Sequence, residues 1–223
     1  ALDAQATADL LESAAAYPGA DINALLLAAL YRGLKRWNGG RGYCVLLQSH
    51  GRHADATALD LSQTVGWFTQ NHPLLLDFDA AGIDRDIAAV GATLAGVPNR
   101  GLGYGVLRFL AREPALQPAG AEPFQVLFNY LGRFDSMVRD AAPLTFLAED
   151  IGPISHPRLP SSVPMGFQGG VYSGRLSMNL EFDARQFSDE RMRRLAACVR
   201  DELLAIVDFS REFQAEASAS DIT

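Results

Sequence analysis

Three polar side chains, Gln48, His50 and Arg52, follow directly after a short apolar run at 43–47. An apolar run of this length bounded by glycines predicts a buried strand, so these side chains are expected at a strand end, where loops face solvent or a channel. A carboxamide such as that of Gln48 can orient a substrate or donate hydrogen bonds, although it cannot hold and release a proton near neutral pH. The alternative is a strand-end amide satisfied by the backbone.

A second strand-like run, 124–131, ends in Asn129 and Tyr130, whose polar groups could bind a substrate. For Tyr130 the alternative is packing in the core with its hydroxyl satisfied. Trp67 lies in an apolar setting and is expected in the core more than in contact with a ligand. These two strand ends are the candidate sites of the chain.

Other chemistries fit the sequence poorly. His50 and His53 are close, but only Asp55 could join them as a third ligand, so no metal site is predicted. The glycine-rich stretch at 101–105 follows a helix rather than a strand, which argues against dinucleotide binding and favours a tight turn. The nucleophile elbow of a serine hydrolase, G-x-S-x-G, does not occur.

Composition is that of an ordinary globular protein. The 223 residues are 48% apolar and 20% charged, with a formal net charge of −7. Without a cluster of Lys or Arg, neither nucleic acid nor an anionic membrane surface is an expected partner. The apolar segment 25–30 is too short to span a bilayer, and Cys44 and Cys198 are expected to be free thiols. The cytoplasm is the default location.

The pattern along the chain predicts a single α/β lobe. Apolar residues at helical spacing predict helices at 3–16, 21–37, 83–97 and from 188 onward. Alternating apolar residues and short apolar runs predict strands at 43–47, 63–73, 124–131 and 176–182. Within 63–73, Val65 and Trp67 are expected in a buried strand. The proline-rich stretch 143–164 predicts a long loop with at most one strand at 144–147. Residues 215–223 are expected to form a frayed tail.

Four stretches carry a family signature. They read Q-S-H-G-R at 48–52, Q-T-V-G-W-F-T-Q-N-H-P at 63–73, P-N-R-G-L-G-Y-G at 98–105 and F-N-Y-L-G-R at 128–133. In this order and spacing they resemble the C-terminal half of the epimerization domains of nonribosomal peptide synthetases, in the condensation-domain superfamily. The resemblance implies a chloramphenicol acetyltransferase-like half-domain: residues 1–214 as a C-terminal lobe, with a mixed sheet and helices on one face.

The resemblance also implies a function. Such domains invert the α-carbon of an aminoacyl or peptidyl thioester, carried on the phosphopantetheine arm of a peptidyl carrier protein, in a channel between two lobes. The implied partners are therefore the carrier protein and an N-terminal lobe, and no cofactor is bound directly. The implied catalytic positions are Gln48, His50, Asn129 and Tyr130, and the implied channel positions are Arg52, Trp67, Thr69 and Tyr104.

Two departures from the family pattern bear on activity. Gln48 stands where the E-G-H-G-R-E motif has its catalytic glutamate, and no His-His-x-x-x-Asp-Gly motif occurs. The isolated lobe is therefore expected to be inactive, and a half-domain should expose an apolar face. One rival function is a degenerate module that docks a carrier protein or neighbouring domain. The other is acyl transfer of the condensation type, against which G-W-F-T at 66–69 argues.

Overall fold

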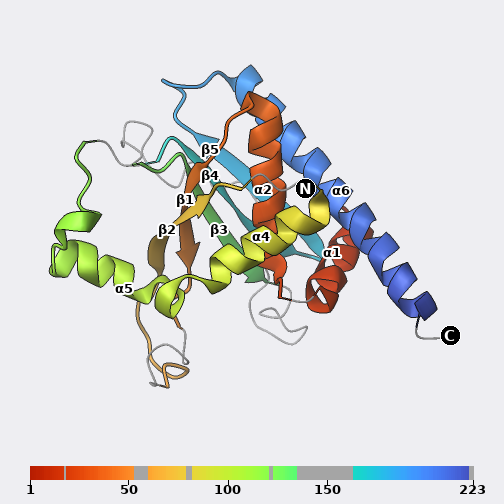
Figure 1. Ribbon diagram of the computed structural model, residues 1–223, viewed down its shortest axis with the longest axis horizontal. Helices are drawn as coiled ribbons and strands as arrows, with labels where there is room; N and C mark the ends of the chain where they lie inside the picture. Colours follow the sequence, from red (N-terminus) through yellow and green to blue (C-terminus); the bar gives the residue numbers. More distant parts are fainter. Residues whose placement is uncertain (18, 53–59, 79–81, 121–122, 135–162, 221–223) are drawn as a thin grey trace, which may run out of the picture.

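The computed structural model describes residues 1–17, 19–52, 60–78, 82–120, 123–134 and 163–220 (Figure 1). The longer helices are α1 (Ala4–Ala16), α2 (Ile22–Asn38), α4 (Ile83–Ala95) and α6 (Asp189–Ser220). The strands are β1 (Tyr43–Ser49), β2 (Gln70–Leu76), β3 (Val126–Arg133), β4 (Met165–Tyr172) and β5 (Arg175–Phe182). Short helical turns connect them: η1 (Pro98–Gly101), α5 (Leu102–Gly105), η2 (Val106–Leu110) and η3 (Pro114–Leu116).

The five strands form one mixed sheet in the order β2-β1-β3-β4-β5. The central pairs, β1 with β3 and β3 with β4, are parallel, whereas the outer pairs, β1 with β2 and β4 with β5, are antiparallel. Parallel neighbours need long crossover connections, so strands that are distant in the sequence meet at the centre of the sheet. The predicted mixed sheet is confirmed.

The four longer helices pack on one face of the sheet. Figure 1 shows α2 and α4 passing in front of the strands, with α6 running along the edge beside α1. The side chains of β1 and β3 that point to these helices, among them Val45, Val126 and Phe128, belong to one buried cluster with the apolar residues of α2 and α6. The predicted α/β class with helices on one face is therefore confirmed.

The predicted helix boundaries have local chemical causes. The side chains of Asp3 and Asp21 accept hydrogen bonds from the backbone N–H groups of Ala6 and Ala24, which caps α1 and α2. Gly39 ends α2 in the left-handed conformation, which glycine adopts without a Cβ clash. These ends are therefore set by residues within a few positions of the helix termini.

Arg32 ties three helices together on the far side of the core. From α2, its Nη1 lies 2.5 Å from Asp86 Oδ2 of α4, and its Nε donates to Glu202 Oε2 of α6 at 2.7 Å. The Asp86 side chain is only 4% exposed. Beside this cluster, Gly33 lets α6 approach so closely that a Cβ on it would lie 2.6 Å from Val199 Cγ2.

The prediction of a buried strand that includes Val65 and Trp67 is wrong. Val65 is 99% exposed and Trp67 88% exposed, and β2 begins only at Gln70. The local pattern resembles a strand, but residues 63–69 pair with no strand in the part of the chain that the structure describes. The apolar side chains of Val65 and Trp67 therefore stay exposed, and the segment forms a loop ahead of β2.

Other predicted boundaries shift outward. β1 continues to Ser49 and β3 to Arg133, so Gln48 lies within β1, whereas His50 and Arg52 follow it as expected. The strands predicted above do not include residues 165–172, where β4 contains the glycine pair 169–170. α6 continues to Ser220, past the start of the predicted tail at 215. The predicted strand at 144–147 lies outside the described residues.

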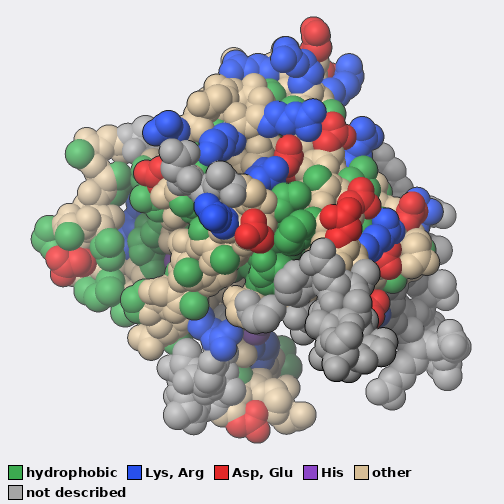
Figure 2. Space-filling model, turned by 45° about the vertical axis from the view of Figure 1, so that its right-hand side comes forward, with side chains coloured by type: hydrophobic (Ala, Val, Ile, Leu, Met, Phe, Trp, Pro, Cys, Tyr) green, Lys and Arg blue, Asp and Glu red, His purple; other side chains and the backbone are tan. Residues whose placement is uncertain are grey.

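Apolar side chains are uncovered at one end of the molecule. Figure 2 shows hydrophobic side chains gathered at the end that α5 and η2 occupy. In η2 these are Val106, Leu107, Phe109 and Leu110, which are 52%, 47%, 66% and 79% exposed. The expected apolar surface is therefore present, and it comes from a segment that projects beyond the edge strand β2.

Candidate functional site

Gln48 and Asn129 form the centre of the candidate site. They lie directly opposite each other on the parallel strands β1 and β3, and Asn129 Nδ2 donates a hydrogen bond to Gln48 Oε1 at 2.7 Å. Both side chains are half-buried. They point to the face of the sheet opposite the four longer helices, because their strand neighbours Leu47 and Phe128 point into the helix-side core. The structure thus brings these two predicted residues together.

Tyr104 joins this face from α5. Its ring packs against a second apolar cluster formed by Leu46, Phe124 and Val163, and Leu46 lies two residues before Gln48 on the same face of β1. The tyrosine hydroxyl accepts a hydrogen bond from Arg108 Nη1 at 2.6 Å. Tyr104 is therefore held on this face of the sheet by one apolar contact and one polar contact.

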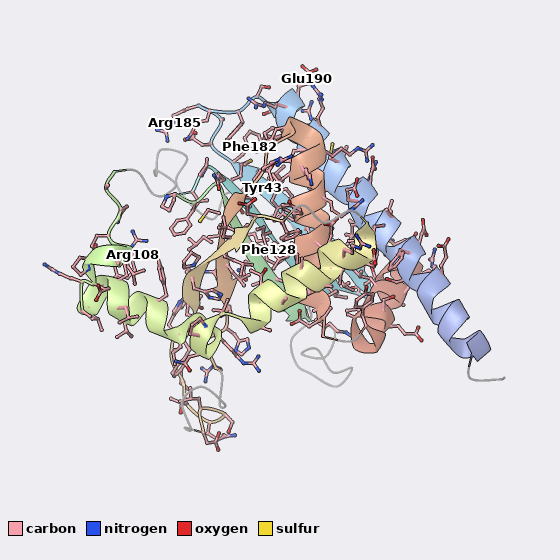
Figure 3. The ribbon with its side chains drawn as sticks, in the orientation of Figure 1. Tyr43, Arg108, Phe128, Phe182, Arg185 and Glu190 are labelled. Atoms are coloured by element: carbon pink, nitrogen blue, oxygen red, sulfur yellow. The ribbon has the colours of Figure 1, made fainter. Side chains whose placement is uncertain are left out.

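Figure 3 distinguishes the two faces. Phe128, labelled on β3, lies beneath α2 and α4 in the helix-side core, whereas Arg108 lies in the segment that projects past β2. The Arg108 side chain is buried, at 6% exposed, although its helical neighbours are exposed. Burying this guanidinium fixes the direction of η2 and so the position of Tyr104.

The loop after β1 is held by Arg52. Its guanidinium donates to the carbonyl oxygens of Leu61 at 2.7 Å and Gly66 at 3.2 Å, and it lies 4.2 Å from the centre of the Phe68 ring. The backbone N–H of Arg52 donates to His50 Nδ1 at 3.0 Å. These contacts give His50 a loop-orienting role and Arg52 a structural role at the predicted channel.

Gly51 makes that loop possible. It has a φ of +68°, and a Cβ there would lie 1.8 Å from the carbonyl oxygen of Phe68. The loop residues Trp67 and Thr69, both predicted to line the channel, are exposed. Their exposure overturns the core interpretation of Trp67 and leaves both side chains available for an intermolecular contact.

Tyr130 is not brought to the Gln48–Asn129 pair. It follows Asn129 on β3, so it points to the opposite face, where it packs half-buried against the helix-side core. This burial raises the pKa of its phenol above the ordinary value. The alternative expected from the sequence, a tyrosine packed in the core, describes its position.

His72 is a structural residue of β2. It is 4% exposed, and Gly101 lies over its ring so closely that a Cβ on that glycine would be 2.1 Å from His72 Nδ1. The φ of +85° at Gly101 is also one that side chains rarely adopt. This contact explains the glycine in the stretch 98–105: the turn packs on the buried imidazole at the sheet edge.

A cavity of about 370 Å³ lies elsewhere, between α2, α6 and the helix-side face of β3, β4 and β5. Its lining is mostly apolar and includes Phe128, Phe167 and Leu203, together with Arg193 and Arg200 of α6. None of the predicted site residues lines this cavity. Gln48 and Asn129, which form the centre of the site, point to the opposite face of the sheet. The cavity is a gap in the core layer and is separate from the candidate site.

The described part of the site holds carboxamides rather than acids or bases at its centre. Gln48 and Asn129 can orient a substrate and donate hydrogen bonds to a developing oxyanion, but neither can take up a proton near neutral pH. Within the described ranges, no three His, Cys, Asp or Glu side chains come together as metal ligands. His53, weighed above as a ligand, lies outside these ranges. Among the described helices, none has the length and apolar composition of a membrane span.

The cysteines are both free, as expected, and half-buried. Cys44 lies on β1 on the same face as Gln48, and burial raises the pKa of its thiol. A raised pKa lowers the thiolate fraction, so Cys44 is a packing residue and not an activated nucleophile.

A family model for the condensation domain matches residues 1–221, so the chain belongs to the condensation-domain family. Its curated relatives are peptide synthases. It is 35% identical over 196 residues to chondramide synthase cmdD from Chondromyces crocatus, covering 88% of this chain and 5% of that protein. It is 30% identical over 190 residues to bacitracin synthase 3 from Bacillus licheniformis, covering 84% of this chain and 3% of that protein.

Among solved structures, the chain resembles the epimerization domain from the third module of tyrocidine synthetase B. The TM-score is 0.82 at 26% identity, covering 94% of this chain and 47% of that one. The first condensation domain of the CDA synthetase matches with a TM-score of 0.59 at 16% identity, covering 92% of this chain and 43% of that one, which shows a common fold. The chain therefore spans about half of such a domain and a small part of its curated relatives.

Proposed function

We propose that this chain is the C-terminal lobe of an epimerization domain in a nonribosomal peptide synthetase. Its substrate is an aminoacyl or peptidyl thioester on a carrier protein, inverted at the α-carbon. The observation that carries the proposal is the TM-score of 0.82 to an epimerization domain, against 0.59 for a condensation domain. The motif G-W-F-T at 66–69 supports the same choice.

In this proposal the Gln48–Asn129 pair faces the substrate. Inversion removes the α-proton and returns it to the other side of the carbon, while negative charge develops on the thioester oxygen. The side-chain amide N–H₂ of Gln48 takes no part in the hydrogen bond with Asn129, so it is available to donate to the thioester oxygen. The proton itself must move through a titratable group, which the described centre of this lobe does not supply.

The phosphopantetheine arm of the carrier reaches this face past the loop that Arg52 organises. Trp67 and Thr69 offer it an exposed indole and an exposed hydroxyl, and Tyr104 offers a ring edge beside the pair. His50 keeps its loop-orienting role. Tyr130 receives no catalytic role, because its side chain packs against the other face of the sheet.

The missing half of the site is an N-terminal lobe. The exposed apolar side chains of η2, above all Phe109 and Leu110, form a surface whose exposure to water is unfavourable in free energy. We assign this surface to the contact with that lobe or with the channel entrance it forms. The lobe by itself is expected to leave the α-proton of a carrier-bound aminoacyl thioester unexchanged.

The proposed function is tested by the substitution Gln48→Glu in the complete two-lobe protein. This substitution introduces a titratable carboxyl group at the position of β1 that pairs with Asn129 of β3. Exchange of the α-proton should rise by about 10²-fold, the low end of the range for an acid–base group, with a bell-shaped pH dependence that the parent lacks. The measurement is release of α-tritium from carrier-bound aminoacyl and peptidyl thioesters, each assayed separately.

A matched control is Gln5→Glu, which makes the same substitution on α1, in the helix layer on the other face of the sheet. It should leave tritium release at the parent level, because position 5 is exposed and lies outside the candidate site. If the parent protein already exchanges the α-proton rapidly and Gln48→Glu changes nothing, the assignment of Gln48 to the catalytic position is wrong. If neither protein exchanges it, the docking-module alternative gains support.

A further inference from the structure

A row of five carboxamides crosses the helix-free face of the sheet. The pairing register places one Asn or Gln of each strand directly beside the next: Asn71 on β2, Gln48 on β1, Asn129 on β3, Gln168 on β4 and Asn179 on β5. Directly paired residues point to the same face, so the five side chains form one line perpendicular to the strands. We call this line the amide row.

The amide row is continuous with the candidate site. Its middle contains the Gln48–Asn129 hydrogen bond, and further along Gln168 Nε2 donates to Glu181 Oε1 at 2.7 Å. Gln48, Asn129 and Gln168 are half-buried, and Asn179 is exposed. From the reacting centre in the proposed function, the row therefore leads across β4 to the outer edge of the sheet at β5.

The chemistry of the row matches a peptide main chain. A carboxamide has both an N–H₂ donor and a C=O acceptor, as each peptide unit has an N–H and a C=O, and neither side carries charge. A substrate with a single amino acid has no peptide unit upstream of its α-amine to pair with such a row. A row of neutral donors and acceptors suits a peptidyl substrate better than a single charged aminoacyl group.

The length of the row sets the length of the peptide. From Gln48 to Asn179 there are three strand spacings of about 4.8 Å, or about 14 Å. An extended chain covers about 3.3 Å per residue, so this distance accommodates about four residues. In the other direction Asn71, on the edge strand β2, offers only one further amide, so the row favours a chain running toward β5.

We propose that the amide row binds the main chain of a peptidyl thioester, with the residues upstream of the reacting one lying over Asn129, Gln168 and Asn179. The proposal deepens the proposed function and rests on it: it selects the peptidyl substrate over the aminoacyl one. It also adds two binding residues, Gln168 and Asn179, that no sequence motif identifies.

The experiment is an NMR titration of the 223-residue chain with pantetheine amides of peptides one, two, four and six residues long. The amide linkage replaces the thioester, so no turnover is needed. The side-chain N–H₂ resonances of Gln168 and Asn179 should shift with the four-residue probe and stay in place with the one-residue probe. Affinity should rise by about two- to tenfold per added hydrogen bond up to four residues and then level off.

Variants separate the row from its surroundings. Gln168→Leu together with Asn179→Leu should remove the gain in affinity from one to four residues. Ser177→Ala, on the same face of β5 but off the row, and Glu181→Gln should keep it. If the double variant fails to fold, the resonance shifts in the parent chain still decide the question.

Three outcomes overturn the proposal. The first is that pantetheine without a peptide shifts the row as strongly as the four-residue probe, which would assign the row to the carrier arm. The second is that affinity does not depend on peptide length, and the third is that no probe shifts the row resonances. Failure of the proposed function shows differently: the Gln48→Glu protein releases no tritium while length-dependent peptide binding by the row persists.

Discussion

Removing the Arg32 guanidinium should destabilise the fold more than any exposed charge change on the same helix. Arg32→Met keeps an unbranched apolar stem in α2 but leaves Asp86 without its ion pair. Asp86 is 4% exposed, and its Oδ1 already has no hydrogen-bond partner in the described structure. The substitution thus leaves the Asp86 carboxylate buried between α2 and α4 without the hydrogen bond that Arg32 donates to it.

The expected cost follows from that burial. Breaking a buried ion pair by removing one partner costs about 3–5 kcal/mol, whereas a whole domain is stable by only about 5–15 kcal/mol. For a chain of this size, each kcal/mol lowers Tm by about 2–4 °C, so a Tm lower by about 6–20 °C is expected. Replacing Asp86 as well, as Arg32→Met with Asp86→Leu, should recover most of the loss, because the buried Asp86 carboxylate is removed and Glu202 keeps Arg36 at 3.5 Å.

The assay is urea unfolding and thermal melting followed by far-UV circular dichroism. The matched control is Arg36→Met, one turn further along α2, whose side chain is 55% exposed and lies 3.5 Å from the same Glu202. An exposed pair of this kind contributes about 0–1 kcal/mol. The reasoning is refuted if Arg32→Met costs no more than Arg36→Met, or if the double substitution is less stable than Arg32→Met alone.

Two further predictions concern the turn over His72 and the exposed indole. Gly101→Ala should lower the free energy of unfolding in urea by at least about 2 kcal/mol, because it places a Cβ against the His72 ring at a positive φ. The control Gly103→Ala should lower it by less than about 1 kcal/mol, because nothing lies within 4 Å of a Cβ at that position. Equal losses for the two variants would contradict the contact with His72. Trp67→Ala should change the free energy of unfolding by less than about 0.5 kcal/mol, since the side chain is 88% exposed; a loss of about 3–5 kcal/mol would instead indicate a buried indole.

Local chemistry in the sequence determined the helices and the family. Asp21 and Gly39 mark the two ends of α2 because side-chain capping and a left-handed glycine act within a few residues of chain. The motif at 48–52 identified the candidate strand end, and the structure places Gln48 and Asn129 in direct contact. A resemblance carried by four ordered motifs needs no tertiary information, and the family match over residues 1–221 agrees with it.

Tertiary structure decided which side chains share a face. Alternation along a strand shows that Asn129 and Tyr130 point to opposite sides, but only the packing of the helices shows which side is covered. The same limit explains the error at Trp67: a strand-like pattern forms a strand only where a neighbour pairs with it. The amide row depends on the register of four strand pairs, including two parallel ones joined by long connections. Because these pairings are non-local, no local pattern could have placed Gln168 in line with Gln48.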